Sequence, residues 1–286
     1  MRRRYRLAVL GGSFDRLHVG HRALLRRAFD IADRVAVGVT SDAFLAAHPK
    51  PNGDRIEPYV RRRRRVERLL AASYPRARWR LAALEDRFGG SVAPGPDVLV
   101  ATADTRAGAR AVNRERRRRG LPPLAVHLLP LVLGDDLRPL SSRRVRAGEI
   151  TPDGRRRRPL RIALTGVSTG EAGAILRAVS SLLPRPGPLR RVRAPRGTGS
   201  TAARAGAAAR RADLGIALSP GKGGGGRPRR LAVATPEGRI GPAVAIPRGK
   251  DGATRALGRA FRGALRRYRA GRSAGGRRSP RRSGPG

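Results

Sequence analysis

The sequence predicts an α/β fold, with a doubly wound parallel sheet in residues 1–150 and a second, smaller α/β domain after it. Short apolar runs of strand length alternate with helical patterns through the first half, and a polar or glycine-containing stretch follows each run. Strands that are apolar throughout are typical of parallel sheets covered by helices on both faces. The 286 residues also suffice for two domains, each able to bury a core.

The strands of the first domain are expected, in chain order, at residues 7–10, 35–39, 79–84, 98–101 and 125–129. Apolar residues at helical spacing predict helices after the first strand and over 61–72 and 108–119. Five arginines open the helix at 61–72, and we interpret them as its solvated face. Ligands of such sheets bind at the carboxyl ends of the strands, so the polar residues that follow each strand are candidates for a site.

The composition is strongly basic, with 64 Lys and Arg against 20 Asp and Glu and a net charge of +44. Such a surface attracts phosphorylated metabolites and nucleic acid. The arginines are spread along the whole chain, however, which favours a general compositional bias, and only weak, non-specific nucleic-acid binding is expected. Aromatic residues that could stack on bases make up 3% of the chain.

Other classes are disfavoured by what the sequence lacks. It contains no cysteine, which excludes disulfides, thiolate metal sites and cysteine nucleophiles. No apolar run approaches the ~18–20 residues of a membrane span. The basic start, residues 1–6, leads directly into the first strand, so no signal peptide is expected and a cytoplasmic location is predicted.

The most informative stretch is residues 11–21, Gly-Gly-Ser-Phe-Asp-Arg-Leu-His-Val-Gly-His. A strand, a glycine turn and a helix in this order present backbone N–H groups and a helix N-terminus to a phosphate. Gly11 and Gly12 let the backbone approach a ligand closely. His18 and His21 lie three residues apart at the start of the helix, so both can donate hydrogen bonds to one anion.

A second candidate stretch is residues 140–146, Leu-Ser-Ser-Arg-Arg-Val-Arg. Two hydroxyls before a basic helix suit a helix N-cap that also binds phosphate. By itself this pattern is more typical of a simple cap. Its candidate phosphate ligands are Ser141, Ser142 and Arg146.

Residues 11–21 resemble the signature of the HxGH nucleotidyltransferase superfamily, G-G-T-F-D-P-x-H-x-G-H, with Ser13 in place of Thr and Arg16 in place of Pro. The stretch around Ser141 resembles the I-S-S-T-x-x-R motif of the same superfamily. Further segments resemble archaeal-type phosphopantetheine adenylyltransferases, namely residues 38–44, 104–113, 120–124 and 146–150. Asp104 stands where that family has Glu, and Ala103 where it has Pro.

This resemblance implies a Rossmann-like nucleotidyltransferase domain and adenylyl transfer from ATP to 4′-phosphopantetheine, which yields dephospho-coenzyme A and pyrophosphate. It implies catalytic roles for His21, His18 and Arg146. The nucleotide would be bound by those three residues together with Gly11, Gly12, Ser13, Phe14, Asp104, Thr105, Asn113, Ser141 and Ser142. The acceptor would be bound by Ser13, Thr40 and Lys50, with Ser13 and Lys50 as candidates for its phosphate. Mg²⁺ is expected with ATP, but no residue is identified as a metal ligand.

Two alternatives remain open at this point. One keeps the chemistry but changes the acceptor to nicotinamide mononucleotide, riboflavin phosphate or a polyol phosphate, with adenylyl or cytidylyl transfer. The other is a nucleic-acid-binding protein on an inactive scaffold.

Beyond a predicted linker at 151–159, a domain is expected at 160–270, followed by a disordered basic tail at 271–286. Strands are expected at 160–164, 213–218 and 230–238, and a helix at 171–183. This half faintly resembles the inosine/xanthosine triphosphatase family. The turn at 168–172 lacks that family's lysine, and Ser219 replaces its acidic residue, so the resemblance implies a scaffold that has lost its chemistry.

Overall fold

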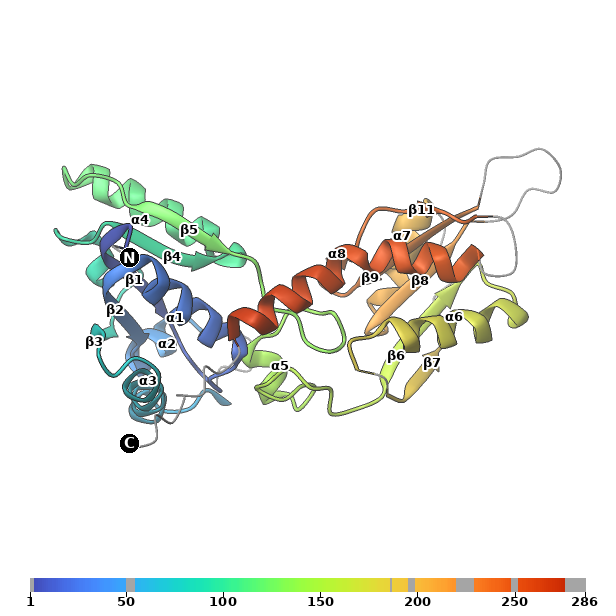
Figure 1. Ribbon diagram of the computed structural model, residues 1–286, viewed down its shortest axis with the longest axis horizontal. Helices are drawn as coiled ribbons and strands as arrows, with labels where there is room; N and C mark the ends of the chain where they lie inside the picture. Colours follow the sequence, from blue (N-terminus) through green and yellow to red (C-terminus); the bar gives the residue numbers. More distant parts are fainter. Residues whose placement is uncertain are drawn as a thin grey trace, which may run out of the picture. The chain divides into compact units, whose positions relative to one another are not determined.

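The computed structural model describes residues 3–49, 55–185, 187–194, 199–219, 229–247 and 252–275, without the side chains of 272–275. The chain divides into two compact units (Figure 1). The first contains the described parts of Met1–Val132, Ser141–Gly148 and Gly271–Gly286, and the second those of Leu133–Leu140 and Glu149–Ala270. The chain therefore visits the second unit at 133–140, returns to the first for eight residues and leaves it again at Glu149.

The first unit is built on a five-stranded sheet in the order β3-β2-β1-β4-β5, in which all neighbouring strands are parallel. Its strands are β1 (Tyr5–Gly12), β2 (Ala32–Thr40), β3 (Arg78–Leu84), β4 (Val98–Thr102) and β5 (Ala125–Leu129). The order reverses between β1 and β4, which is the point where such sheets bind ligands at their carboxyl ends. The predicted doubly wound sheet and its five strands are confirmed.

Helices cover both faces of this sheet. Successive side chains of a strand point to opposite faces, so neighbouring residues of β1 pack into different cores. Ala8 and Leu10 of β1 share a core with α1 (Val19–Ile31) and α3 (Tyr59–Ser73). Val9, between them, packs with α4 (Arg106–Arg118) in a separate core. Shorter elements follow the strands: α2 (Asp42–Ala47), the 3₁₀ turns Gly89–Val92 and Ala103–Thr105, and α5 (Ser142–Arg146).

The second unit contains a mixed sheet in the order β10-β9-β8-β6-β7, with β11 also paired to β9. Its strands are β6 (Leu160–Thr165), β7 (Leu189–Val192), β8 (Leu214–Leu218), β9 (Arg230–Thr235), β10 (Gly238–Arg239) and β11 (Val244–Ala245). β6 is parallel to β7 and β8, whereas β9 is antiparallel to its neighbours. The predicted second α/β domain is thus confirmed.

The two faces of this second sheet are packed differently. Large apolar side chains lie between the sheet and the helices α6 (Thr169–Leu182) and α8 (Gly252–Gly275). The opposite face packs against α7 (Thr201–Ala209) almost entirely through alanines. Gly215 allows this close approach, because a Cβ there would lie 2.1 Å from the carbonyl oxygen of Ala205.

The predicted linker at 151–159 is folded within the second unit, where Ile150 and Arg156 form an antiparallel bridge. Helix α8 runs on to Gly275, so it enters the segment that was predicted to lack regular structure. Residues 276–286 lie outside the described residues.

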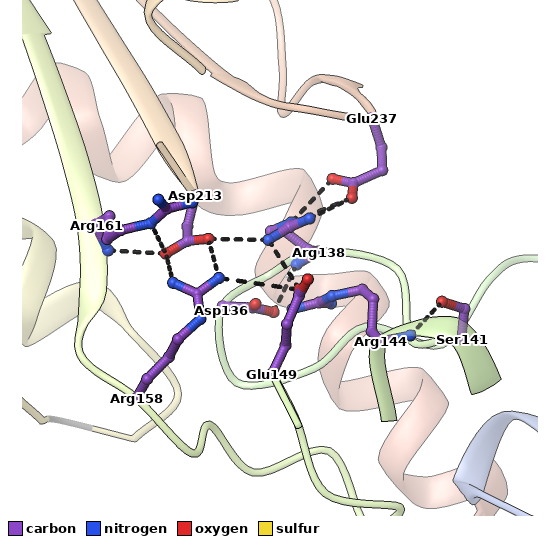
Figure 2. A network of polar contacts seen from close by, with 9 residues as sticks. All are labelled: Asp136, Arg138, Ser141, Arg144, Glu149, Arg158, Arg161, Asp213 and Glu237. Atoms are coloured by element: carbon purple, nitrogen blue, oxygen red, sulfur yellow. Dashed lines mark hydrogen bonds and ion pairs between the residues drawn. The ribbon is translucent and has the colours of Figure 1, made fainter. Parts of the chain in front are cut away.

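A buried ionic network ties segment 133–140 into the second unit (Figure 2). Arg138 contacts Asp213 at 3.0 Å, Glu237 at 2.7 Å and Glu149 at 3.5 Å. Arg158 binds both carboxylate oxygens of Asp213 at 2.9 Å. Burial alone would raise the pKa of Asp213, but the bonds from the Arg161 N–H and from these guanidinium groups hold it below its usual value. Asp213 is therefore a structural anion of this unit.

Candidate active site

The turn after β1 has an unusual backbone. Phe14 and Arg16 both adopt left-handed φ values, +49° and +47°, which cost non-glycine residues about 1 kcal/mol or more. The Phe14 ring is 1% exposed in the core, and its centroid lies 5.2 Å from that of His21. Phe14 therefore packs in the core beside His21, and the nucleotide contact expected of it stays a prediction.

Gly11 lies where β1, β2 and β3 come together at their carboxyl ends. A Cβ at Gly11 would approach Leu84 of β3 to 3.3 Å, and Gly11 pairs in register with Gly38 of β2. Because Gly11 and Gly38 have no side chains, the strands and Leu84 pack closely at this edge of the sheet.

The two histidines cap helix α1. The Nδ1 atom of His18 accepts a hydrogen bond from the Gly20 N–H at 3.1 Å, and Nδ1 of His21 accepts one from the His18 N–H at 3.4 Å. An accepting Nδ1 carries no proton, so each neutral ring has its proton on Nε2. The rings stack with their centroids 3.8 Å apart. Capping and ligand binding are therefore compatible: Nδ1 serves the helix, and Nε2–H is left as a donor.

Both histidines are neutral at physiological pH in this structure. Burial lowers the pKa of His18 to about 4, and the Asp15 carboxylate opposes this only in part. Burial and the neighbouring His18 hold the pKa of His21 well below its usual value. Each ring therefore offers a neutral N–H donor to an anion.

The lowered pKa of His18 makes folding pH-dependent. The unfolded chain takes up a proton near pH 6.5 and the folded one only near pH 4, so stability is lost as pH falls through this window. We expect the lowered pKa of His18, by itself, to reduce the free energy of unfolding by about 2 kcal/mol when the pH falls from 7 to 5. Urea unfolding of the parent and of His18→Gln at both pH values measures this. Equal losses in the two proteins would contradict it.

An ion pair joins the two predicted phosphate-binding stretches. Asp15, fully buried, accepts from Nη1 of Arg146 at 2.5 Å and from the Glu57 N–H at 3.1 Å. The Arg146 side chain is 6% exposed, and its Nε has no hydrogen-bond partner among the described residues. This ion pair therefore holds the turn after β1 against α5 within the first unit. The two stretches can thus contribute to one site.

The two serines of α5 have different roles. Ser141 is the N-cap, and its Oγ accepts from the Arg144 N–H at 3.4 Å. Ser142 donates its hydroxyl proton to the Asp15 carbonyl oxygen at 2.8 Å. The Ser142 hydroxyl can therefore donate to a phosphate only if this bond is broken, whereas the Ser141 hydroxyl proton is not used by its cap.

The residues expected around adenosine lie at the end of β4 and on α4. Asp104 and Thr105 form a turn in which the Thr102 hydroxyl donates to Asp104 at 2.5 Å. Asn113 uses its amide to bond both the N–H and the carbonyl of Leu124, each at 2.9 Å. Asn113 thus fixes the approach to β5, and its contact with adenosine stays a prediction.

On the acceptor side, Ser13 and Thr40 lie after β1 and at the end of β2, and Thr40 is 5% exposed. Lys50 lies outside the described residues. One buried arginine, Arg62 of α3, bonds the carbonyl oxygens of both Ser13 and Thr40. The interpretation of all five arginines at 61–65 as a solvated face was therefore wrong at Arg62.

The sequence reasoning missed Asp15 and Arg62 as site-building residues. Asp15 stands inside the recognised motif, so its position was a usable signal. Arg62 is one of five identical neighbours, and only the helical phase could have distinguished it. Among the described residues there is no group of three His, Cys, Asp or Glu side chains able to hold a metal, and no helix in those ranges is long and apolar enough to cross a bilayer.

The model of the family described as Cytidylyltransferase-like matches residues 9–148. A phosphopantetheine adenylyltransferase of Methanopyrus kandleri is 40% identical over 148 residues, which cover 51% of this chain and 92% of that protein. Its counterpart in Methanothermobacter thermautotrophicus is 39% identical over 155 residues, 54% of this chain and 91% of that protein. The chain belongs to the phosphopantetheine adenylyltransferase family.

A third relative is named for two activities. The bifunctional phosphopantetheine adenylyltransferase/NTP phosphatase of Thermoplasma volcanium is 31% identical over 160 residues, 55% of this chain and 47% of that protein. Its name joins an adenylyltransferase to a phosphatase, the combination that the sequence resemblance suggested for this family member.

In the second unit, the residues that carry the faint resemblance to the triphosphatase pattern lie at opposite edges of the sheet. Asp213 precedes β8 and accepts from the Arg161 N–H at the amino-terminal edge. At the carboxyl edge, Arg229 donates to Glu171 at 2.5 Å and to the carbonyls of Gly166 and Ser219 at 3.2 Å each. The Arg229 guanidinium group is thus bound to the Glu171 carboxylate, in the turn at 168–172 that lacks the lysine of the triphosphatase family.

We therefore expect no hydrolysis of nucleoside triphosphates by this unit in the adenylyltransferase. A divalent cation on a triphosphate is held by carboxylates, and Glu171 is already paired with Arg229 and capping α6. The full chain, given ITP or XTP with Mg²⁺ or Mn²⁺ and no acceptor, should release no pyrophosphate, and Asp213→Asn should not change this result. Robust turnover in the parent would contradict it.

Proposed function

We propose that the chain transfers the adenylyl group of ATP to 4′-phosphopantetheine, giving dephospho-coenzyme A and pyrophosphate in coenzyme A synthesis. The observation that carries the proposal is the pair of stacked histidines whose Nε2–H donors stand at the start of α1, on the carboxyl edge of β1. The relatives named for this activity support it, since the chain covers more than nine-tenths of their length.

The reaction requires positioning and charge stabilisation, with no group of the protein acting as a nucleophile. An oxygen of the acceptor phosphate attacks the α-phosphorus of ATP, and the bond from that phosphorus to the oxygen bridging to the β-phosphate breaks. The negative charge then grows on pyrophosphate. The donors of His18 and His21, with the N-terminal end of α1, would stabilise this charge.

Arg146 would assist on the same side. Asp15 compensates its charge and fixes one guanidinium nitrogen, while Nε, which has no partner among the described residues, is a further buried donor. With the Ser141 hydroxyl, it would bind the β- and γ-phosphates. Asp104 and Thr105, at the end of β4, would border the adenosine. Gly11 and Gly12 would let the nucleotide lie against the backbone.

The acceptor phosphate would be bound on the β2 side by Ser13 and Thr40, and by Lys50 from the following loop. We also propose that Mg²⁺ accompanies ATP. The described side chains form no cage for it, which fits a cation that keeps its waters and is held mainly by the substrate phosphates. When bound, it would neutralise charge on the triphosphate. The cytoplasmic location stays a prediction.

The acceptor is tested by following pyrophosphate release from ATP with a panel of phosphorylated acceptors. 4′-Phosphopantetheine should give a kcat/KM well above those of nicotinamide mononucleotide, riboflavin phosphate and polyol phosphates. CTP should replace ATP poorly. A higher kcat/KM with any other acceptor would overturn the proposed substrate while keeping the reaction type.

Nucleic acid should bind only weakly and without sequence preference. The net charge is +44, but aromatic residues make up only 3% of the chain, so attraction to phosphates is not supplemented by stacking. The logarithm of the affinity should fall linearly as the logarithm of salt concentration rises. Fluorescence anisotropy with several oligonucleotides measures this. Tight binding of one sequence that persists at high salt would contradict it.

A further inference from the structure

Helix α3 carries five consecutive arginines, residues 61–65, of which one differs from the others. Arg62 is completely buried, while Arg61 and Arg64 on the same helix are exposed. Arg63 and Arg65 pair with Glu67 and Glu57 in partly exposed ion pairs. A buried guanidinium group is costly unless every donor finds a partner.

Hydrogen bonds from Arg62 to four separate segments offset the cost of burying its guanidinium group. Nη1 donates to the carbonyl oxygens of Ser13 at 2.9 Å and Thr40 at 2.8 Å, and Nε donates to that of Glu57 at 2.6 Å. Nη2 binds the Asp42 carboxylate at 2.7 Å. The planar guanidinium group thus joins the turn after β1, the end of β2, the start of α2 and the segment before α3.

The contact with Thr40 also orients its hydroxyl. Nη1 lies 3.3 Å from the Thr40 Oγ1 atom. A guanidinium group can only donate, so Oγ1 accepts with a lone pair and its own proton points elsewhere. The Thr40 hydroxyl is therefore prepared as a donor, which is what an anionic ligand requires.

We propose that Arg62 is a positioning residue for the acceptor phosphate, acting through Ser13 and Thr40 without touching the substrate. The inference rests on the proposed function, which places the acceptor phosphate at these two residues. None of the bonds made by Arg62 reaches His18, His21 or Arg146. Its loss should therefore weaken acceptor binding more than ATP binding.

The test compares Arg62→Lys with Arg64→Lys in the full chain. Both keep the charge and the helix, but a lysine at 62 has a single nitrogen and cannot reproduce the planar fork. We expect Arg62→Lys to raise KM for 4′-phosphopantetheine by about tenfold or more, the equivalent of roughly one lost hydrogen bond to a charged group. KM for ATP should change by less than about threefold, equivalent to under one such bond. Arg64→Lys should match the parent in both constants.

A second variant separates positioning from general destabilisation. Thr40→Val removes the oriented hydroxyl and leaves Arg62 in place, so it should also raise KM for the acceptor and spare KM for ATP. If Arg62 acts through Thr40, the double variant should show less than the product of the two single effects. Where Arg62→Lys proves unfolded, the Thr40→Val result alone decides, and an unchanged KM for the acceptor would overturn the inference.

The outcomes distinguish this inference from the proposed function. An active parent in which Arg62→Lys raises both KM values equally, or neither, overturns only the positioning role. If another phosphorylated acceptor proves to be the substrate, the same comparison is made with that acceptor, since the proposed contacts are to its phosphate. A parent that transfers to no acceptor overturns the proposed function and this inference together.

Discussion

Replacing His21 with alanine is expected to lower kcat by a factor on the order of 10²–10³, as for the loss of one donor that stabilises transition-state charge. KM for ATP should change much less, because the Nε2–H bond would be strongest only as charge develops on the leaving pyrophosphate. The same ring also accepts from the His18 N–H, so the free energy of unfolding should fall by about 1 kcal/mol, typical of a lost cap.

The control for this variant is His127→Ala. His127 lies on β5 and accepts from Arg27 at 2.8 Å, away from the glycine turn. The His127→Ala variant should lose at most a little stability and keep the kcat of the parent. A folded His21→Ala protein whose kcat equals that of the parent would contradict the catalytic role and leave His21 as a capping residue only.

Asp15→Asn is expected to affect both activity and stability. The change keeps the shape but removes the charge that compensates Arg146, whose side chain is 6% exposed. Breaking a buried ion pair from one side typically costs about 3–5 kcal/mol. We also expect kcat to fall by roughly 10–100-fold, because a displaced guanidinium group stabilises the phosphate charge less well. Urea unfolding and steady-state kinetics measure the two effects.

Asp97→Asn is the matched control, since Asp97 also binds β1 but at its opposite end. It accepts from the N–H groups of Arg6 and Leu7 at 2.9 and 3.0 Å. Burial would raise the pKa of Asp97, but these two bonds and Arg6 hold it below its usual value, so this variant too should lose stability. Its kcat per folded molecule should stay unchanged. A similar loss of kcat in both variants would mean that Asp15 acts on the fold alone.

The strands of the first sheet could be predicted because each one is a short apolar run that is visible in the local sequence. The run Leu7–Leu10 is apolar on both faces, and it occurs in the structure as part of β1, buried between α1 and α4. In the second unit, β7 was not predicted because its four residues include two exposed arginines. The alanine-rich α7 has little apolar–polar contrast to mark it as a helix in the sequence, and its role is evident only from its close packing against Gly215.

The site was predicted in part for a related reason. Motif residues such as His18 and Ser141 are adjacent in sequence to the helices that they cap, so spacing alone places them. The ion pair between Asp15 and Arg146 joins residues 131 positions apart, and no local pattern encodes such a partner. The burial of Arg62 likewise depends on the phase of α3 against β2, which a run of identical residues conceals.

In the proposed reaction, one site joins ATP directly to the acceptor. The most direct measurement is a time course in which the full chain receives ATP and 4′-phosphopantetheine, and both products are quantified by mass spectrometry. Dephospho-coenzyme A and pyrophosphate should accumulate in a one-to-one ratio, and neither should form when either substrate is omitted. Pyrophosphate released from ATP alone at the same rate, with no dephospho-coenzyme A, would contradict the account.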